Sequence, residues 1–61
     1  MVWYRDYASN VQVGDLIVVE GKKCEVKDLK WGERGTMLVG EGWTKYCQRH
    51  EFMLIGTYVD N

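Results

Sequence analysis

Apolar residues occur along the chain in short runs that glycines separate, and in several runs apolar and polar positions alternate. Alternation with a period of two is typical of half-buried β-strands, which also favour Val, Ile, Thr and aromatic residues. Seven glycines punctuate the sequence, and proline is absent. No long window shows the apolar stripe of an amphipathic helix. The pattern predicts strands over residues 2–7, 16–20, 23–30, 36–40, 43–48 and 53–59.

Turn signals divide these runs. The stretch VGDLIVVEGKKCEV, residues 13–26, is typical of a hairpin, in which we interpret the adjacent lysines as part of a solvated turn. Within residues 23–30 the apolar phase slips by one residue at Lys27, which predicts a β-bulge and a sharp bend. Further turns are expected at residues 32–35 and 41–42, the latter a two-residue hairpin of the primed type, with one helical turn at 49–52.

A chain of 61 residues has room for one domain, residues 1–61. A domain of this size buries roughly 60% of the surface that its unfolded chain exposes, so its core is small. Eight aromatic side chains compensate in part, because each buries a large area. Too few residues are present for a normal two-sheet sandwich, whereas a bent meander can roll up and remove its edges. We therefore predict an all-β fold, a small barrel of five or six short, strongly bent antiparallel strands.

Four stretches support a more specific fold. They are DYA at residues 6–8, VQVGDLIV at 11–18, GW at 42–43 and TYV at 57–59. Their order resembles that of SH3 domains, and Gly-Asp followed by apolar residues is also similar to KOW-type barrels. The resemblance implies an SH3-like barrel over nearly the whole chain. The long acidic loop with which SH3 domains hold proline-rich ligands is missing between Tyr7 and Gly14, so the resemblance leaves the ligand class open.

Charge and hydropathy exclude several classes of protein. The formal net charge of −1 argues against a generic, charge-driven nucleic-acid binder but leaves a local basic patch open. No apolar run approaches the roughly 20 residues of a membrane-spanning helix. The N-terminal stretch MVWYRDY does not have the pattern of a signal peptide. These features predict a cytoplasmic protein.

The sequence offers little chemistry. Cys24 and Cys47 lie far apart and are expected to be two thiols rather than a disulfide. Together with His50 and Glu51 they fall short of the spacing of a four-ligand zinc site. Cys47 and His50 also form a candidate nucleophile–base pair, but a small barrel leaves little room for a pocket and no hydrolase or phosphate-loop motif is present. We therefore expect no catalytic residues, no metal and no cofactor, and hence no enzyme.

The leading hypothesis is a small non-enzymatic module that binds a protein partner through a partly exposed aromatic patch. Tryptophan and tyrosine are frequent anchors of protein interfaces, although a small core must absorb some of the eight aromatic residues. The two tryptophans that flank glycine turns are expected to be the exposed pair. The candidate patch consists of Tyr7, Trp31, Trp43 and Tyr58.

Two alternatives belong to other classes. Basic residues with Trp31 can follow a phosphate backbone and stack a base, although interspersed acidic residues are equally typical of a solvated face. The candidate nucleic-acid-binding residues are Lys22, Lys23, Lys27, Lys30, Arg34, Lys45 and Arg49. In the third class the chain is a structural or oligomer-building subunit, in which an edge strand such as residues 2–7 pairs across a two-fold axis.

Overall fold

The structure, a computed structural model, describes residues 1–59, which contain seven β-strands and one short 3-10 turn. The prediction of an all-β fold is confirmed. In chain order the elements are β1 (Val2–Tyr7), η1 (Ala8–Asn10), β2 (Leu16–Val19), β3 (Lys22–Glu25), β4 (Asp28–Trp31), β5 (Gly35–Gly40), β6 (Trp43–Gln48) and β7 (Phe52–Thr57).

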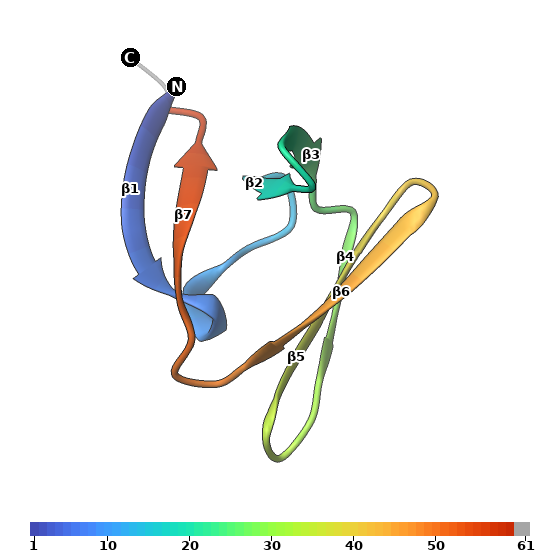
Figure 1. Ribbon diagram of the computed structural model, residues 1–61. Coiled ribbons are helices and arrows are strands. Elements are labelled where there is room, and N and C mark those ends of the chain that lie inside the picture. Colours follow the sequence, from blue (N-terminus) through green and yellow to red (C-terminus); the bar gives the residue numbers. More distant parts are fainter. Residues whose placement is uncertain (60–61) are drawn as a thin grey trace.

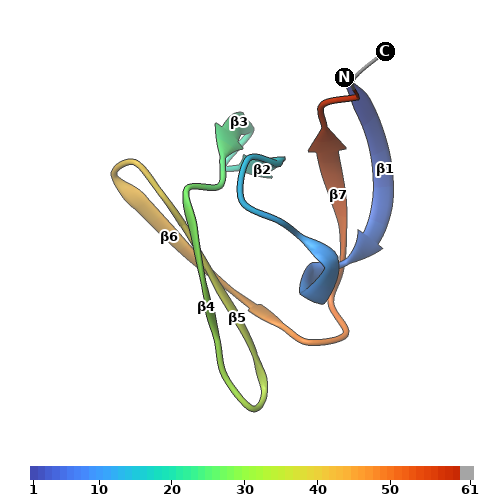
Figure 2. The same ribbon diagram turned by 180° about the vertical axis from the view of Figure 1, so that it is seen from behind.

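The strands form two antiparallel sheets. Sheet A has the order β1-β7-β2-β3, and sheet B has the order β4-β5-β6. Figures 1 and 2 show the sheets as two arms that diverge from each other, with η1 near the end of β1. Within residues 1–59 no strand of sheet A pairs with a strand of sheet B, so the sheets are not closed into one barrel. The expected single closed meander is therefore not what the pairing shows.

The expected strand over residues 23–30 is divided into β3 and β4, which is why the structure has seven strands rather than five or six. The division falls at two adjacent residues. The Val26 amide donates to the Asp15 carbonyl beside sheet A (2.9 Å), whereas the Lys27 amide donates to the Val39 carbonyl of sheet B (2.7 Å). The one-residue slip in the apolar pattern thus marks a corner at which the chain changes sheets, and not a bulge within one strand.

The β2–β3 hairpin confirms the hairpin predicted for residues 13–26, but Lys22 and Lys23 lie in β3 and not in the turn. Its turn has positive φ at both central residues, 51° at Glu20 and 79° at Gly21, which is the geometry of a primed turn. The two-residue hairpin at residues 41–42 is also present, but only Gly42 has positive φ (78°), so the prediction of a primed turn there was wrong. Residues 49–52 contain no helical turn, and β7 already begins at Phe52.

A tight turn with a buried carboxylate leads into β2. The Asp15 amide donates to the Gln12 carbonyl (3.0 Å), and Asp15 Oδ2 accepts from the Gln12 amide (3.0 Å). Gly14 supplies the positive φ of 97° that the turn needs, and its amide donates to Val26 (2.9 Å). The Gly-Asp pair on which the family resemblance depends therefore fixes the start of the hairpin.

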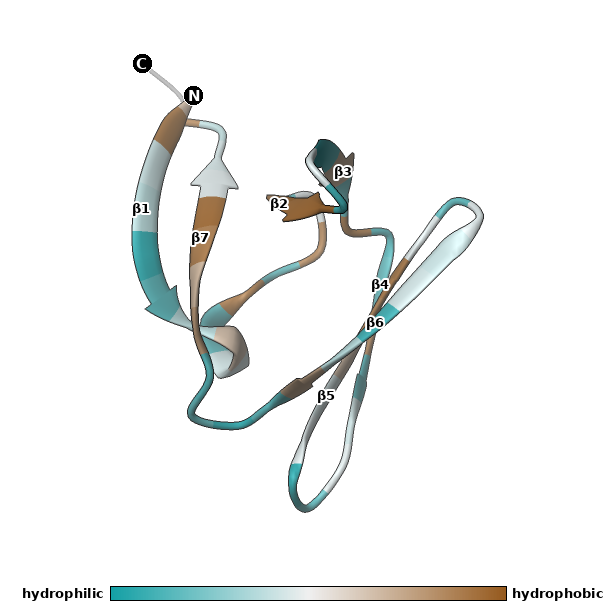
Figure 3. Ribbon diagram, in the orientation of Figure 1, coloured by the Kyte–Doolittle hydropathy of each residue, from teal (hydrophilic) through white to brown (hydrophobic). Residues whose placement is uncertain are grey.

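Side chains from both sheets and from η1 fill the space between the arms. The fully buried apolar residues come from six different segments of the chain, so the core holds the two sheets together. Figure 3 shows the apolar colour along β2 and the middle of β7, the two adjacent central strands of sheet A. The buried residues are Ala8, Val11, Ile17, Val26, Leu38, Cys47 and Ile55, against which Tyr4, Val19, Leu29, Trp43 and Met53 pack.

Candidate functional site

Sheet A presents apolar side chains on the side that faces away from the core. Side chains alternate along a strand, so buried Ile17 and Ile55 place their neighbours Val18 and Leu54 on the opposite face. The strand register brings further residues into line with them on that face. We define the outer face of sheet A as Trp3, Arg5 and Tyr7 of β1, Phe52, Leu54 and Gly56 of β7, Leu16 and Val18 of β2, and Lys23 and Glu25 of β3.

The exposure of this face is unusual for an antiparallel sheet. Such sheets normally show polar residues on the side that faces water. Here Leu54 is 40% exposed, Val18 39% and Phe52 57%. Single apolar residues on a surface need no explanation, but a contiguous set indicates an interaction site. Sheet A is therefore apolar on both faces, while residues 1–59 cover only the inner one.

On one half of the outer face, Trp3 contacts both a neighbouring strand and a lysine. Its ring lies across Gly56 of the neighbouring strand, where an added Cβ would be 2.9 Å from the ring atoms. Lys23 Nζ lies 5.4 Å from the centroid of the same ring, within the range of a cation–π interaction. Trp3, Lys23, Val18 and Leu54 together line an open hollow with about 410 Å³ of empty space. An aromatic ring, two aliphatic side chains and one cation therefore share one depression.

Two further aromatic rings extend the face along β1 and β7. Tyr7 and Phe52 are directly opposite each other in the register and pack edge to face, with ring centroids 5.3 Å apart. His50 adds a second edge contact to Tyr7, at 6.1 Å. These contacts fix the ring positions of side chains that remain about half exposed. The aromatic pair is consequently preorganised for contact with another molecule.

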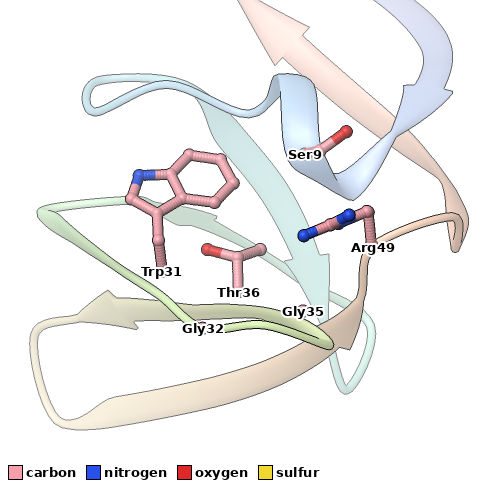
Figure 4. Close-up of a pocket in the computed structure, with 6 residues that line it drawn as sticks. All are labelled: Ser9, Trp31, Gly32, Gly35, Thr36 and Arg49. Atoms are coloured by element: carbon pink, nitrogen blue, oxygen red, sulfur yellow. The ribbon is translucent and has the colours of Figure 1, made fainter.

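A second, smaller hollow lies at the end of sheet B, beside η1. Figure 4 shows the Trp31 ring and the Arg49 guanidinium on opposite sides of it, with Thr36 between them and Ser9 above. The hollow has about 230 Å³ of empty space, and the backbone of two glycines completes its lining. Arg49 Nη2 donates to the Glu33 carbonyl (3.0 Å), which holds the guanidinium in place.

The four residues of the predicted aromatic patch do not come together. Tyr7 belongs to the outer face of sheet A, and Trp31 borders the small hollow, where it is 60% exposed as expected. Trp43 is only half-buried rather than exposed, because its ring lies across Gly40 and packs against the core. Tyr58 follows β7 and is exposed.

The predicted basic residues also point in different directions. Lys22 and Lys23 are adjacent on β3 and therefore lie on opposite faces of sheet A. Lys30 pairs with Met37 and Lys45 with Leu38, which places these two lysines on opposite faces of sheet B. Of the remaining three, Lys27 Nζ pairs with the Glu25 carboxylate (3.3 Å), Arg34 lies in the β4–β5 turn, and Arg49 borders the small hollow.

The pKa values of two groups, Cys47 and Tyr4, are raised, which favours their neutral forms. Burial raises the pKa of the Cys47 thiol, and the nearby Glu51 carboxylate raises it further, while Lys45 acts in the opposite direction. A protonated thiol is a poor nucleophile, so Cys47 is suited to packing. Burial likewise raises the pKa of Tyr4, with smaller contributions from the carboxylates of Asp15 and Asp6.

Three further features of the described residues concern their thiols, metal ligands and helices. Cys24 and Cys47 are both free thiols, as expected. Among residues 1–59, no three His, Cys, Asp or Glu side chains are grouped so that they could hold a metal ion. The part of the chain that the structure describes has no helix of the length and apolarity needed to cross a membrane.

Sequence reasoning missed most of the outer face of sheet A. The runs LIVV at residues 16–19 and FMLI at residues 52–55 carried a signal, because neither alternates with polar residues. The sequence pattern assigns the first run to a strand and divides the second between a helical turn that ends at Phe52 and a strand that begins at Met53. Which side chains face outward followed only from the register. Comparison with protein-family models, with curated proteins and with solved structures finds no match for this chain.

Proposed function

We propose that this chain is a non-enzymatic module that binds another protein, and that the outer face of sheet A is its docking surface. The observation that carries the proposal is that sheet A is apolar on both faces, whereas residues 1–59 cover only one of them. A standard protein interface buries about 800 Å² per partner. The whole surface is 4488 Å², so such a contact would cover about one fifth of it.

The charges at the borders of this face indicate the chemistry of the partner. Arg5 lies on the edge strand β1, and Lys23 reaches from the opposite edge strand β3 to the ring of Trp3, so that two cations stand beside the apolar side chains. Glu25 is the acidic residue of the face. Complementary charges steer partners together and fix their register. The proposed partner is therefore a protein surface with an apolar centre and carboxylates beside it.

A few anchors are expected to supply most of the affinity, as in other protein interfaces. Trp3, Phe52 and Leu54 are the best candidates, because they are large side chains on the outer face and their neighbours already hold the two aromatic rings in place. Tyr7 belongs to this set through its packing against Phe52. The SH3-like arrangement is part of the proposal. Two sheets over one core, joined by a corner at which the chain changes sheets, support an opened form of such a barrel.

Three variants test the docking surface against a matched control. Leu54→Lys and Phe52→Ala alter the apolar centre, and Lys23→Glu reverses a border charge. Trp31→Ala removes an aromatic side chain that is 60% exposed and lies on β4 of sheet B. The wild-type chain is immobilised to capture partners from a cell extract, and the purified partner is then titrated against every variant.

The proposal predicts that Leu54→Lys and Phe52→Ala weaken binding by at least about tenfold, the effect of an anchor residue. Lys23→Glu is expected to weaken it less and mainly by slowing association, and Trp31→Ala by less than about twofold. All variants should keep the far-UV spectrum of the wild type. Equal binding by Leu54→Lys and the wild type would contradict the proposal. So would a wild-type dimer in sedimentation that Leu54→Lys dissociates, because a second copy would then be what covers this face.

A further inference from the structure

The small hollow beside η1 has a lining that the protein-binding proposal does not use. The hollow lies between the β4–β5 turn, the 3-10 turn η1 and Arg49, which follows β6. It shares no residue with the outer face of sheet A. Its lining consists of Ser9, Trp31, Gly32, Gly35, Thr36 and Arg49.

The polar groups of the hollow favour an anion. Arg49 is its charged residue, and no carboxylate lines it. A guanidinium has five N–H donors, and one of them is engaged by the Glu33 carbonyl at 3.0 Å, so several remain for a ligand. That bond also restricts the guanidinium, which reduces the entropy lost on binding. Ser9 lines the hollow on the same side as Arg49 (Figure 4).

The other wall of the hollow favours a flat ring. Trp31 is 60% exposed although it lies on a strand, and its indole stands across the hollow from Arg49 (Figure 4). Thr36 is buried between the two walls, and its hydroxyl donates to the Lys30 carbonyl (3.4 Å). The glycines at residues 32 and 35 keep side chains out of the remaining space.

We propose that this hollow binds one nucleotide, with the base stacked on Trp31 and the phosphate held by Arg49. A simple anion would use the guanidinium and leave the indole without a role, whereas a nucleotide has a flat ring and a phosphate within one small molecule. Stacking on an exposed aromatic side chain accepts any base, and planar guanidinium groups bind phosphate through paired hydrogen bonds. The ligand is either a free mononucleotide or one unit of a single strand, which present the same chemistry to the hollow.

The three tryptophan indole N–H resonances of the full chain give a site-specific readout. Adenosine 5′-monophosphate at low salt is expected to shift the Trp31 resonance and to leave those of Trp3 and Trp43 in place. Adenosine has the base without the phosphate, and ribose 5-phosphate has the phosphate without the base. Each should therefore bind at least about tenfold more weakly than adenosine 5′-monophosphate. A tetranucleotide of deoxyadenosine shows whether the ligand is a free mononucleotide or one unit of a single strand. Tighter binding than that of the mononucleotide assigns a single strand, and equal binding assigns a free nucleotide.

Variants show whether both walls take part. Trp31→Ala and Arg49→Gln are each expected to weaken mononucleotide binding by about tenfold, and Arg49→Lys less, because the charge is kept. Arg34→Gln is the matched control. Arg34 is an exposed cation of the β4–β5 turn but does not line the hollow. The substitution should therefore change binding by less than about twofold. Thermal unfolding of each variant separates lost binding from lost structure.

Two results would overturn the inference. In one, ribose 5-phosphate or inorganic phosphate binds as tightly as adenosine 5′-monophosphate, which would make the hollow a plain anion site. In the other, the Trp31 resonance does not move at millimolar mononucleotide. Either result leaves the docking surface on sheet A untouched, because the two proposals rest on different residues.

Discussion

Replacing Gly35 by alanine is expected to lower the melting temperature of the protein by at least about 10 °C. Gly35 is buried at the start of β5, opposite Gln48 of β6. An added Cβ would stand closer than 3.0 Å to both the Cys47 carbonyl oxygen and the Tyr46 hydroxyl. The carbonyl belongs to the backbone of a paired strand and cannot rotate away, so the two strands must separate.

The size of the effect follows from the marginal stability of a small domain. Overpacking a tight site costs about 1–3 kcal/mol and occasionally more. A chain of 61 residues is expected to have a free energy of unfolding of only about 3–9 kcal/mol. Each lost kcal/mol lowers the melting temperature of so small a domain by about 4–8 °C. We therefore expect Gly35→Ala to melt at least about 10 °C below the wild type in a circular-dichroism scan.

Gly32→Ala is the matched control in the same turn. A Cβ at Gly32 would have the Gly35 carbonyl oxygen at 3.7 Å as its nearest neighbour, which is an ordinary contact. Alanine also restricts the unfolded chain, which favours the fold, so the net effect should lie within about 1 kcal/mol of zero. If both substitutions lower the melting temperature equally, the close approach of β5 and β6 at Gly35 is wrong.

The second large effect is expected at Ile55. This side chain is fully buried between the sheets, whereas its neighbour Leu54 points to the outer face and is 40% exposed. Truncating a buried isoleucine to alanine costs about 2–5 kcal/mol, because apolar contacts are lost and a cavity remains. Leu54→Ala removes the same number of carbon atoms from a partly hydrated site and should cost less than about 1 kcal/mol.

Urea unfolding of the two variants measures this difference directly. The pair is well matched, because leucine and isoleucine are isomers in adjacent positions of one strand. Ile55→Ala should lower the urea midpoint by more than about 1 M, given a slope of about 1–2 kcal/mol per molar for a small domain. Equal losses for Ile55→Ala and Leu54→Ala would mean that both faces of β7 are covered within this chain, and the outer face would then not be available to a partner.

The fold class was accessible from the sequence because its signals are local. Glycines and alternating side chains located most strand boundaries, and the phase slip at Lys27 located the corner between the sheets. The interpretation of that slip as a bulge was wrong because a change of sheet gives the same pattern. Only the hydrogen bonds of the Val26 and Lys27 amides to different sheets separate the two cases.

The candidate sites depend on contacts between distant segments, which local patterns do not contain. Trp3 meets Gly56 and Lys23 because β7 lies between β1 and β2, an order that the sequence does not state. Trp31 and Arg49 are likewise brought together by tertiary pairing, since the Arg49 amide donates to the Arg34 carbonyl (3.1 Å). The prediction that tryptophans near glycine turns are exposed therefore identified Trp31, but it missed most of the outer face of sheet A.

Site-specific photo-crosslinking tests the docking surface most directly. A photoreactive phenylalanine analogue replaces Phe52 on the outer face of sheet A in one sample and Tyr46, an exposed tyrosine of sheet B, in another. Each sample is irradiated together with the purified partner. The account predicts crosslinks to the partner from position 52 and none from position 46. Crosslinks from position 46 alone, or from position 52 only to a second copy of this chain, would contradict it.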